Sequence, residues 1–192
     1  EADGDVGGVT FSAGYMLQVT VSAVTDLKLN NAHGGSVKVK TDAEAADTST
    51  AKWQYTTEEE KNTSIATAQA GYSFAGWYTD SDCTDKVSNN ASFEYAFGTN
   101  GTHVYYALFT ANTYTITYKD GTDPLGFTST YKITDTSVDL ESYSKTGYTF
   151  GGWDSVEWTD NDHSSALPTV SGTTLTNNGG YGNVTVFAVW TT

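Results

Sequence analysis

The chain of 192 residues contains few of the groups on which many small folds and sites depend, with one cysteine, two prolines, three histidines and no arginine. Because Cys83 is alone, no internal disulfide can form, and the fold is not a disulfide framework. Nine lysines stand against 23 acidic residues, and the formal net charge is −14. Such a charge repels a phosphate backbone, and the forked donor that clamps phosphates is missing. We therefore expect no nucleic-acid partner.

Motifs for membrane insertion and for catalysis are also lacking. No apolar run is long enough to span a membrane, and the first residues do not have the charged-then-apolar pattern expected of a signal segment. The histidines, His33, His103 and His163, fall in separate segments, and neither an H-x-x-x-H spacing nor a G-x-S-x-G elbow occurs. We expect no enzyme activity and no cofactor. Since the chain opens at Glu1 within a pattern, we expect a monomeric part of a longer multidomain chain.

One aromatic phrase occurs twice at a constant offset, as GYSFAGW from Gly71 and as GYTFGGW from Gly147. Repeats of this kind indicate a small fold built twice. We predict repeat domains at residues 26–110 and 111–192. Residues 1–25 are interpreted as the tail of a preceding repeat or as an added edge strand, because VTVSAVT resembles the closing VTVFAVW. The shared signature comprises Gly71, Tyr72, Phe74, Gly76, Trp77, Gly147, Tyr148, Phe150, Gly152 and Trp153.

Period-two alternation predicts the strands. In the second copy, the alternating residues of 114–118 and of 127–133 flank the polar turn DGTDPLG, which predicts a hairpin with one buried face. In the first copy, the same reasoning joins residues 27–29 to 37–39 through the turn NAHGG. The crossovers that follow have too few apolar residues for a long helix, and a single turn or irregular chain is expected. The fold class is mainly β, an α+β fold with minimal helix.

The signature is interpreted as architecture. Strict alternation would place Phe74 and Trp77 on opposite faces of a strand. A bulge at Gly76 would return Trp77 to the face of Phe74, and Gly152 would do the same in the second copy. Tyr72 and Phe74 are then expected to pack. The closing strand 184–190 is apolar in both parities, which predicts a central strand with Trp190 in the core.

These phrases, together with the closing strands VYYALF and VTVFAVW, resemble the Listeria-Bacteroides repeat family, the B-repeat-like modules of bacterial surface proteins. The resemblance covers nearly all of both copies, although Asp154 stands where the first copy has Tyr78. It implies two tandem β-grasp-like domains that are non-catalytic, extracellular and located at the bacterial cell surface. It also implies a spacer or stalk with a role in adhesion, whose partner would be a host-surface protein or glycan.

Two sets of residues outside the shared core are candidate sites. Asp80, Asp82 and Asp85 have a spacing that resembles a calcium loop, although a tight site needs more oxygen ligands. Trp158, Trp53 and Tyr181 either fill their own insertions or lie exposed, where such rings stack on sugars or anchor a protein. The second possibility defines an alternative function, a carbohydrate-binding module.

Overall fold

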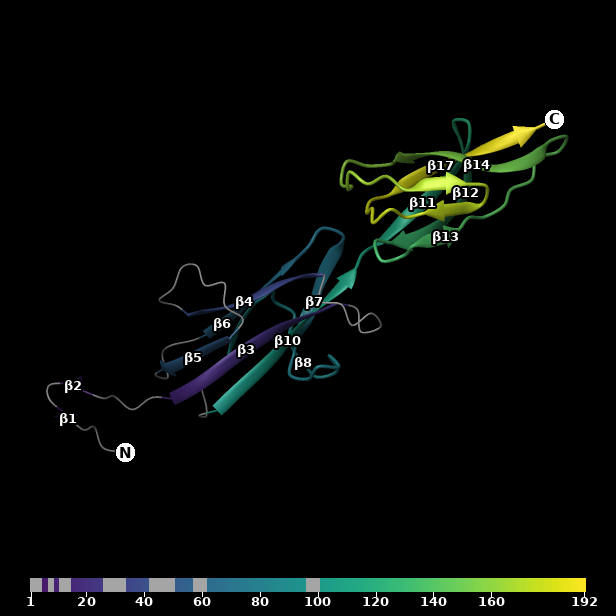
Figure 1. Ribbon diagram of the computed structural model, residues 1–192. Helices are drawn as coiled ribbons and strands as arrows, with labels where there is room; N and C mark the ends of the chain where they lie inside the picture. The colour runs from purple at the N-terminus through teal and green to yellow at the C-terminus, as the bar shows by residue number, and fades with distance from the viewer. Residues whose placement is uncertain are drawn as a thin grey trace. The chain divides into compact units, whose positions relative to one another are not determined.

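The computed structural model describes residues 5–6, 9–10, 15–25, 34–41, 51–56, 62–95 and 101–192, with side chains at 34–39, 63–94 and 103–192. The chain divides into two compact units, Glu1–Thr110 and Ala111–Thr192, both visible in Figure 1. All regular elements in these ranges are strands, and none of the described residues is helical. The fold is thus all-β, and the small helical content expected from the sequence is not found in the described part.

The second unit contains a four-stranded sheet in the order β12-β11-β17-β14 (Figure 1). Its strands are β11 (Thr113–Asp120), β12 (Asp123–Lys132), β14 (Thr149–Trp158) and β17 (Val184–Thr191). β11 and β12 form the predicted hairpin, with Tyr114 opposite Tyr131. β17 runs parallel to β11 and antiparallel to β14. The closing strand β17 therefore lies inside its sheet, as predicted from the apolar residues on both of its faces.

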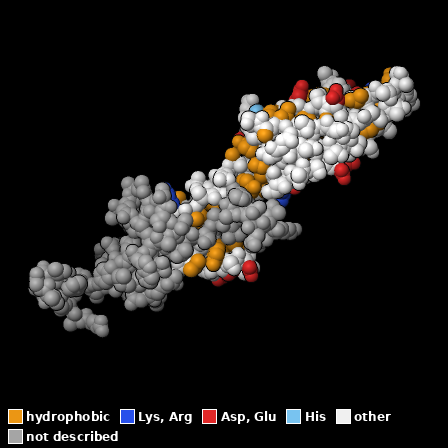
Figure 2. Space-filling view, viewed as in Figure 1, with side chains coloured by type: hydrophobic (Ala, Val, Ile, Leu, Met, Phe, Trp, Pro, Cys, Tyr) orange, Lys and Arg blue, Asp and Glu red, His pale blue; other side chains and the backbone are white. Residues whose placement is uncertain are grey.

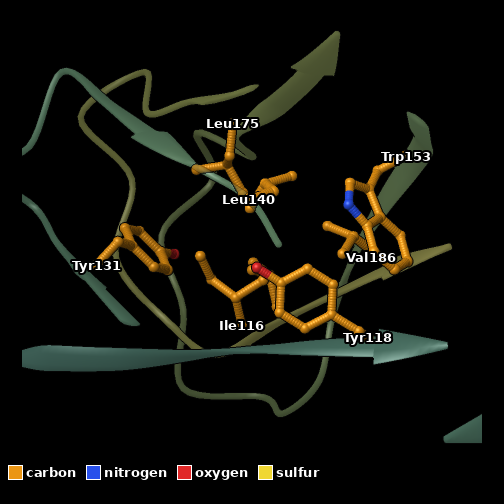
Figure 3. Packing of buried hydrophobic residues seen from close by; sticks show 8 residues of the cluster. Ile116, Tyr118, Tyr131, Leu140, Trp153, Leu175 and Val186 are labelled. Carbon is orange, nitrogen blue, oxygen red and sulfur yellow. The ribbon is translucent and has the colours of Figure 1, made fainter. Parts of the chain in front are cut away.

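A smaller sheet accompanies the first, in the order β13-β16-β15. Its strands are β13 (Ser137–Asp139), β15 (Thr169–Ser171) and β16 (Thr174–Thr176). Leu175 of β16 and Leu140 after β13 face residues of β11, including Ile116 and Tyr118, as Figure 3 shows. Because side chains alternate between the two faces of a strand, every second residue of β11 and of β17 points toward the smaller sheet. The buried cluster comprises Ile116, Tyr118, Tyr131, Leu140, Trp153, Leu175, Val184 and Val186.

The first unit has a five-stranded sheet in the order β5-β3-β10-β7-β8. Its strands are β3 (Tyr15–Thr25), β5 (Ala51–Thr56), β7 (Tyr72–Tyr78), β8 (Lys86–Ser88) and β10 (Gly101–Ala111). A second sheet, in the order β4-β6-β9, consists of β4 (Gly35–Thr41), β6 (Asn62–Ala68) and β9 (Ser92–Tyr95). β1 (Asp5–Val6) and β2 (Val9–Thr10) form a separate ribbon. The buried cluster is Val39, Ala66, Trp77, Ala107 and Phe109.

β3 is an interior strand, with β5 on one side and β10 on the other. It pairs in parallel with β10, placing Val19 opposite His103, whereas β11 pairs in parallel with β17 and places Ile116 opposite Val184. Each of these opening strands also pairs with an antiparallel neighbour, β5 or β12. An added edge strand, one of the two interpretations of residues 1–25, is therefore wrong for residues 15–25. The likeness of its sequence to a closing strand reflects a shared interior position in the sheet.

The predicted opening hairpin of the first copy lies partly outside the described residues and stays a prediction. β4, which contains Val37 and Val39, pairs with β6 in the second sheet. Residues 27–29, its predicted partner, lie outside the described residues. β6 moreover occupies part of the segment expected to be a single turn or irregular chain. Local alternation predicted these strands but could not choose their partners, because pairing depends on contacts between distant segments.

Candidate functional site

The repeated phrase of the second unit contains a β-bulge. Phe150 lies opposite Trp190, but Gly152 lies opposite Val189, so the register of β14 on β17 shifts by one residue. Gly152 has a φ of 100°, which favours glycine. The rings of Phe150 and Trp153 therefore meet on one face, with centroids 5.3 Å apart at 71°. The predicted bulge is confirmed here.

Trp153 is held on both its backbone and its ring. Its backbone N–H donates to the carbonyl oxygen of Gly172 at 2.8 Å, and its indole Nε1 donates to that of Glu141 at 2.7 Å. A Cβ at position 152 would lie 2.7 Å from the Cα of Gly172, so the approach of the two backbones requires glycine. The Trp153 side chain is only 3% exposed. This residue plugs the core and does not form an open surface.

The phrase in the first unit brings its two rings together in a similar way. Gly76 has a φ of 147°, and the rings of Phe74 and Trp77 lie 5.7 Å apart in an edge-to-face contact. Trp77 is fully buried and its indole donates to the carbonyl oxygen of Ala91 at 3.4 Å. Gly71 at the start of the phrase also has a positive φ, 85°. The two copies thus share a packing motif with buried tryptophans.

Two aromatic residues of the second unit lie nearer the surface than the sequence suggested. Tyr148 is 48% exposed, and Trp190 is only partly buried and lies outside the buried cluster. The expectation that Trp190 belongs to the core is therefore wrong. Its indole Nε1 donates to Oδ1 of Asp120 at 2.9 Å, which satisfies the polar edge of the ring. The end of β17 thus presents an amphipathic ring instead of a plug.

An ion pair adjoins these rings. Lys145 Nζ lies 2.6 Å from Asp120 Oδ2, and it is 5.2 Å from the centroid of the Tyr148 ring and 5.5 Å from that of Trp190. The hydrogen bonds from Lys145 and then from Trp190 lower the pKa of Asp120. The hydrogen bond to Asp120 raises the pKa of Lys145. Both groups are therefore held in their charged forms at neutral pH.

These rings continue into a row that we call the aromatic shelf, defined as Phe127, Tyr143, Tyr148 and Trp190. Centroids of neighbouring rings lie 6.0 Å apart for Phe127 and Tyr143, 5.7 Å for Tyr143 and Trp190, and 6.3 Å for Tyr148 and Trp190. At the Phe127 end is a depression of about 160 Å³, lined by Phe127, Thr128, Glu141 and Ser142. Trp190 lies in β17 and Tyr143 in the crossover between β13 and β14, and the two are brought together only by the fold.

The aromatic candidates chosen from the sequence have other surroundings. Trp158 is stacked on His163, with centroids 4.6 Å apart and planes 7° from parallel, so one ring face is covered. Tyr181 is partly buried near Tyr114, at 6.2 Å between centroids. The side chain of Trp53 lies outside the described residues. Neither described candidate belongs to the aromatic shelf.

The acidic loop of the first unit uses its carboxylates internally. Asp80 accepts hydrogen bonds from the backbone N–H groups of Thr84 at 2.7 Å and of Asp85 at 2.9 Å, and these lower its pKa. Oδ2 of Asp85 accepts from the Thr79 hydroxyl at 2.8 Å, while Asp82 is exposed. Within the ranges that the structure describes, no three His, Cys, Asp or Glu side chains are grouped to hold a metal ion.

Cys83 lies in the same loop at a φ of 51° and is buried. Burial raises the pKa of its thiol, and the carboxylates of Asp80 and Asp82 raise it further. The thiolate is the nucleophilic form of cysteine, so these neighbours disfavour reactivity. The arrangement is that of a closed loop and not of a nucleophile.

Charge is dispersed on the second unit. Figure 2 shows its Asp and Glu side chains spread over the visible face instead of gathered in one place. In the part of the chain that the structure describes, there is no helix long and apolar enough to cross a membrane. The nine lysines are dispersed along the sequence and are the only basic residues that could offset the net charge of −14.

Comparison with known families shows two matches in tandem. Residues 31–107 and residues 114–189 each match the model of the Listeria-Bacteroides repeat domain. Each matched segment includes one copy of the aromatic phrase and most of the strand that follows it in the centre of the sheet. No curated protein and no solved structure matches the chain.

Proposed function

The chain belongs to the Listeria-Bacteroides repeat domain family, and on that premise we propose that it is a non-catalytic spacer within a bacterial cell-surface or secreted protein. The observation that carries the proposal is the burial of Trp77 and Trp153, at 0% and 3% exposure, each in the core of its own unit. The most recognisable residues of the repeat thus support its architecture. A chain of self-contained units sets a distance without needing a catalytic cleft.

The connection between the units supports a spacer as well. β10 ends at Ala111 and β11 begins at Thr113, so a single residue, Asn112, separates the two strands. Short connections restrict the freedom of neighbouring domains more than long Gly/Ser linkers do. We propose domain bounds near residues 15–110 and 111–192, which include β3 in the first domain, whereas the sequence alone predicts a start at residue 26.

The β-grasp-like character implied by the family resemblance is retained as a proposal for each domain. In the second unit it is supported by a sheet order in which the opening strand β11 lies next to the closing strand β17 and parallel to it. The crossover carries the short strand β13 where a helix would be expected. Localisation at the bacterial surface, adhesion to a host-surface protein or glycan, and absence of a nucleic-acid partner belong to the same proposal.

The spacer function is tested by chain length. Small-angle scattering of the present chain and of a tandem duplication of residues 15–192 is compared with that of a Gly/Ser chain with the same number of residues. A spacer increases its maximum dimension nearly in proportion to the number of repeats, whereas a flexible coil grows close to the square root of length. Square-root growth of the duplication would contradict the proposal.

The second candidate function, carbohydrate binding through Trp158, Trp53 or Tyr181, stays a proposal of lower standing. The stacking of Trp158 on His163 leaves at most one face of that ring for a sugar. The aromatic shelf offers rings beside polar groups that form no hydrogen bond with other described side chains. It carries the inference that follows.

A further inference from the structure

We propose that the aromatic shelf of the second unit is a binding site for a neutral oligosaccharide. The site begins at the depression beside Phe127 and continues along Tyr143 and Trp190 to Tyr148. It is independent of the spacer proposal, because a spacer needs no ligand.

The rings supply the apolar part of the site. Tyr148 is 48% exposed, while Phe127, Tyr143 and Trp190 are each partly exposed. Phe127 and Tyr143 also pack against the core cluster, so only part of each ring faces outward. The apolar surface that the four rings still expose is costly to leave in water, since aromatic side chains dominate the energetics of cores and interfaces alike. Pyranose rings present C–H faces that cover such surfaces without requiring a large aliphatic patch.

The polar groups beside the rings suit sugar hydroxyls. The depression is bordered by the Glu141 carboxylate and by the hydroxyls of Ser142 and Thr128, all of which are exposed. Among the residues whose side chains the structure describes, none forms a hydrogen bond with these three groups. A carboxylate accepts, while a hydroxyl both donates and accepts, so together they match a vicinal diol. At the other end of the shelf, Asp120 and Lys145 provide a second polar pair.

Charge selects a neutral glycan over an anionic polymer. Two carboxylates, Asp120 and Glu141, adjoin the shelf, against one lysine that is already paired, and the whole chain carries −14. Sulfated or phosphorylated chains would be repelled by this field. The shelf therefore favours a ligand rich in hydroxyls and without charge.

The size and composition of the surface favour a sugar over a protein partner. Large exposed aliphatic side chains in the described part of the chain are Val87, Val104 and Leu167, and none of these lines the depression or belongs to the shelf. Protein interfaces bury roughly 800 Å² on each partner around an apolar centre. A depression of about 160 Å³ is below the usual range for drug-sized ligands and suits one sugar unit of a longer chain.

In the described part of the first unit the corresponding position is covered, and this unit serves as an internal control. Phe109, the counterpart of Trp190, is fully buried, and the backbone of Gly35 lies against its ring. Binding at the shelf should therefore be a property of the second unit alone. One site per chain is expected.

The test uses the full chain and a defined panel of neutral hexasaccharides, namely β-1,4-glucose, β-1,4-xylose, β-1,4-N-acetylglucosamine and α-1,4-glucose. Isothermal titration is carried out with wild type, Tyr148→Ala and Glu141→Gln. Tyr148→Ala removes an exposed ring and Glu141→Gln keeps shape, so both should fold. Binding of at least one hexasaccharide with a stoichiometry of one is expected, and each variant should weaken it about tenfold.

Matched controls locate the site. Tyr72→Ala removes the corresponding tyrosine of the first unit, while Trp158→Phe and Tyr181→Ala remove the aromatic candidates chosen from the sequence. All three should bind as wild type does. Ligand should also change the tryptophan fluorescence of Trp158→Phe but leave that of Trp190→Phe nearly unchanged.

Three results would overturn the proposal. These are no heat at millimolar concentrations of any hexasaccharide, full affinity in both Tyr148→Ala and Glu141→Gln, or loss of binding in Trp158→Phe or Tyr181→Ala with the shelf variants unaffected. The last result would move the site to the other aromatic residues. None of them affects the scattering test of the spacer.

Discussion

Phe109 in the first unit and Trp190 in the second occupy the same place in two related sheets. Phe109 lies 5.8 Å from Phe74 at 59°, and Trp190 lies 5.5 Å from Phe150 at 57°. Phe74 and Phe150 each contact the buried tryptophan of their phrase. Yet Phe109 has no exposed surface, whereas Trp190 is partly exposed.

The difference is explained by what lies over each ring. In the first unit, β4 lies in the sequence between the opening strand β3 and its antiparallel partner β5. A Cβ on Gly35 of β4 would lie 2.5 Å from Cε1 of Phe109, so β4 covers this ring. In the second unit, β11 and β12 are separated only by a short turn, so no strand corresponds to β4. Side chains such as Lys145 flank Trp190 instead.

One insertion can therefore close a position in one copy that stays open in the other. The aromatic pairs within each sheet keep nearly the same geometry, so the shared packing does not depend on the cover. The cover decides which side chain suits the position. Beneath β4 the apolar ring of Phe109 fits, whereas Trp190 lies partly at the surface, where its indole N–H donates to Asp120.

The largest expected effect tests this cover. Phe109→Ala should destabilise the first unit by about 3 to 5 kcal/mol, since it removes a fully buried ring and leaves a cavity. Trp190→Ala should destabilise the second unit by a clearly smaller amount, because part of that ring already contacts water. Urea unfolding followed by hydrogen exchange of peptides from each unit measures both values. Equal losses in the two units would contradict the comparison.

The two glycines of the repeated phrase, Gly152 and Gly76, provide a test of intermediate size. Gly152→Ala should cost about 2 to 4 kcal/mol, because a left-handed residue is strained and its Cβ would meet the backbone of Gly172. Gly76→Ala should cost less, since its Cβ would meet the flexible side chain of Lys86 at 2.9 Å and no backbone atom closer than the carbonyl oxygen of Ser88 at 3.0 Å. Gly147→Ala is the matched control, with a positive φ but open space, and about 1 to 2 kcal/mol is expected from the backbone alone. Thermal unfolding measures all three, and equal shifts for Gly152→Ala and Gly147→Ala would show that the close approach is unimportant.

The smallest expected effect concerns the ion pair that adjoins Trp190. The lowered pKa of Asp120 means that its contribution is present above the ordinary carboxyl pKa and is lost as pH falls through the lowered value. The raised pKa of Lys145 means that its contribution is present below the ordinary lysine pKa and is lost as pH rises through the raised value. Asp120→Asn should therefore slightly lower the melting temperature of the second unit at pH 7.

Salt and pH separate that effect from lost packing. Because both side chains are partly exposed, at 22% and 42%, the difference between wild type and Asp120→Asn should shrink in 1 M NaCl and again at strongly acidic pH. Lys145→Met serves as a control that keeps the length of the side chain. A difference that is the same at every pH and salt concentration would show that Asp120 acts through its hydrogen bond to the Trp190 indole alone.

Local sequence was sufficient for several features. Alternation in residues 114–118 and 127–133 predicted the β11–β12 hairpin. Residues 184–190 are apolar on both faces of the strand, which predicted a central position in the sheet. The glycine directly before Trp153 predicted the bulge. Phe150 and Trp153 are three residues apart on a strand and can share a face only if the register shifts. Each of these features follows from neighbours within one segment.

The aromatic shelf could not be predicted in the same way. Tyr143 lies in a crossover without regular structure, and the apolar strand that contains Trp190 predicts a core position for this residue. Their contact, and the depression beside Phe127, depend on where the crossover crosses the sheet. The nearest signal in the sequence was the absence of an insertion between β11 and β12, which leaves the strand end uncovered.

By itself, the sequence determined that the chain is a tandem β-repeat, where the hairpin and the bulge of its second copy lie, and that it carries a net charge of −14. These properties depend on side-chain period, on glycine conformations and on net charge, all of which are local or additive. Only the tertiary structure decided that β3 lies inside a sheet, that β4 covers Phe109 and that Trp190 remains partly exposed. Strand partners and coverage arise between residues far apart in the chain, where the same apolar pattern fits more than one neighbour.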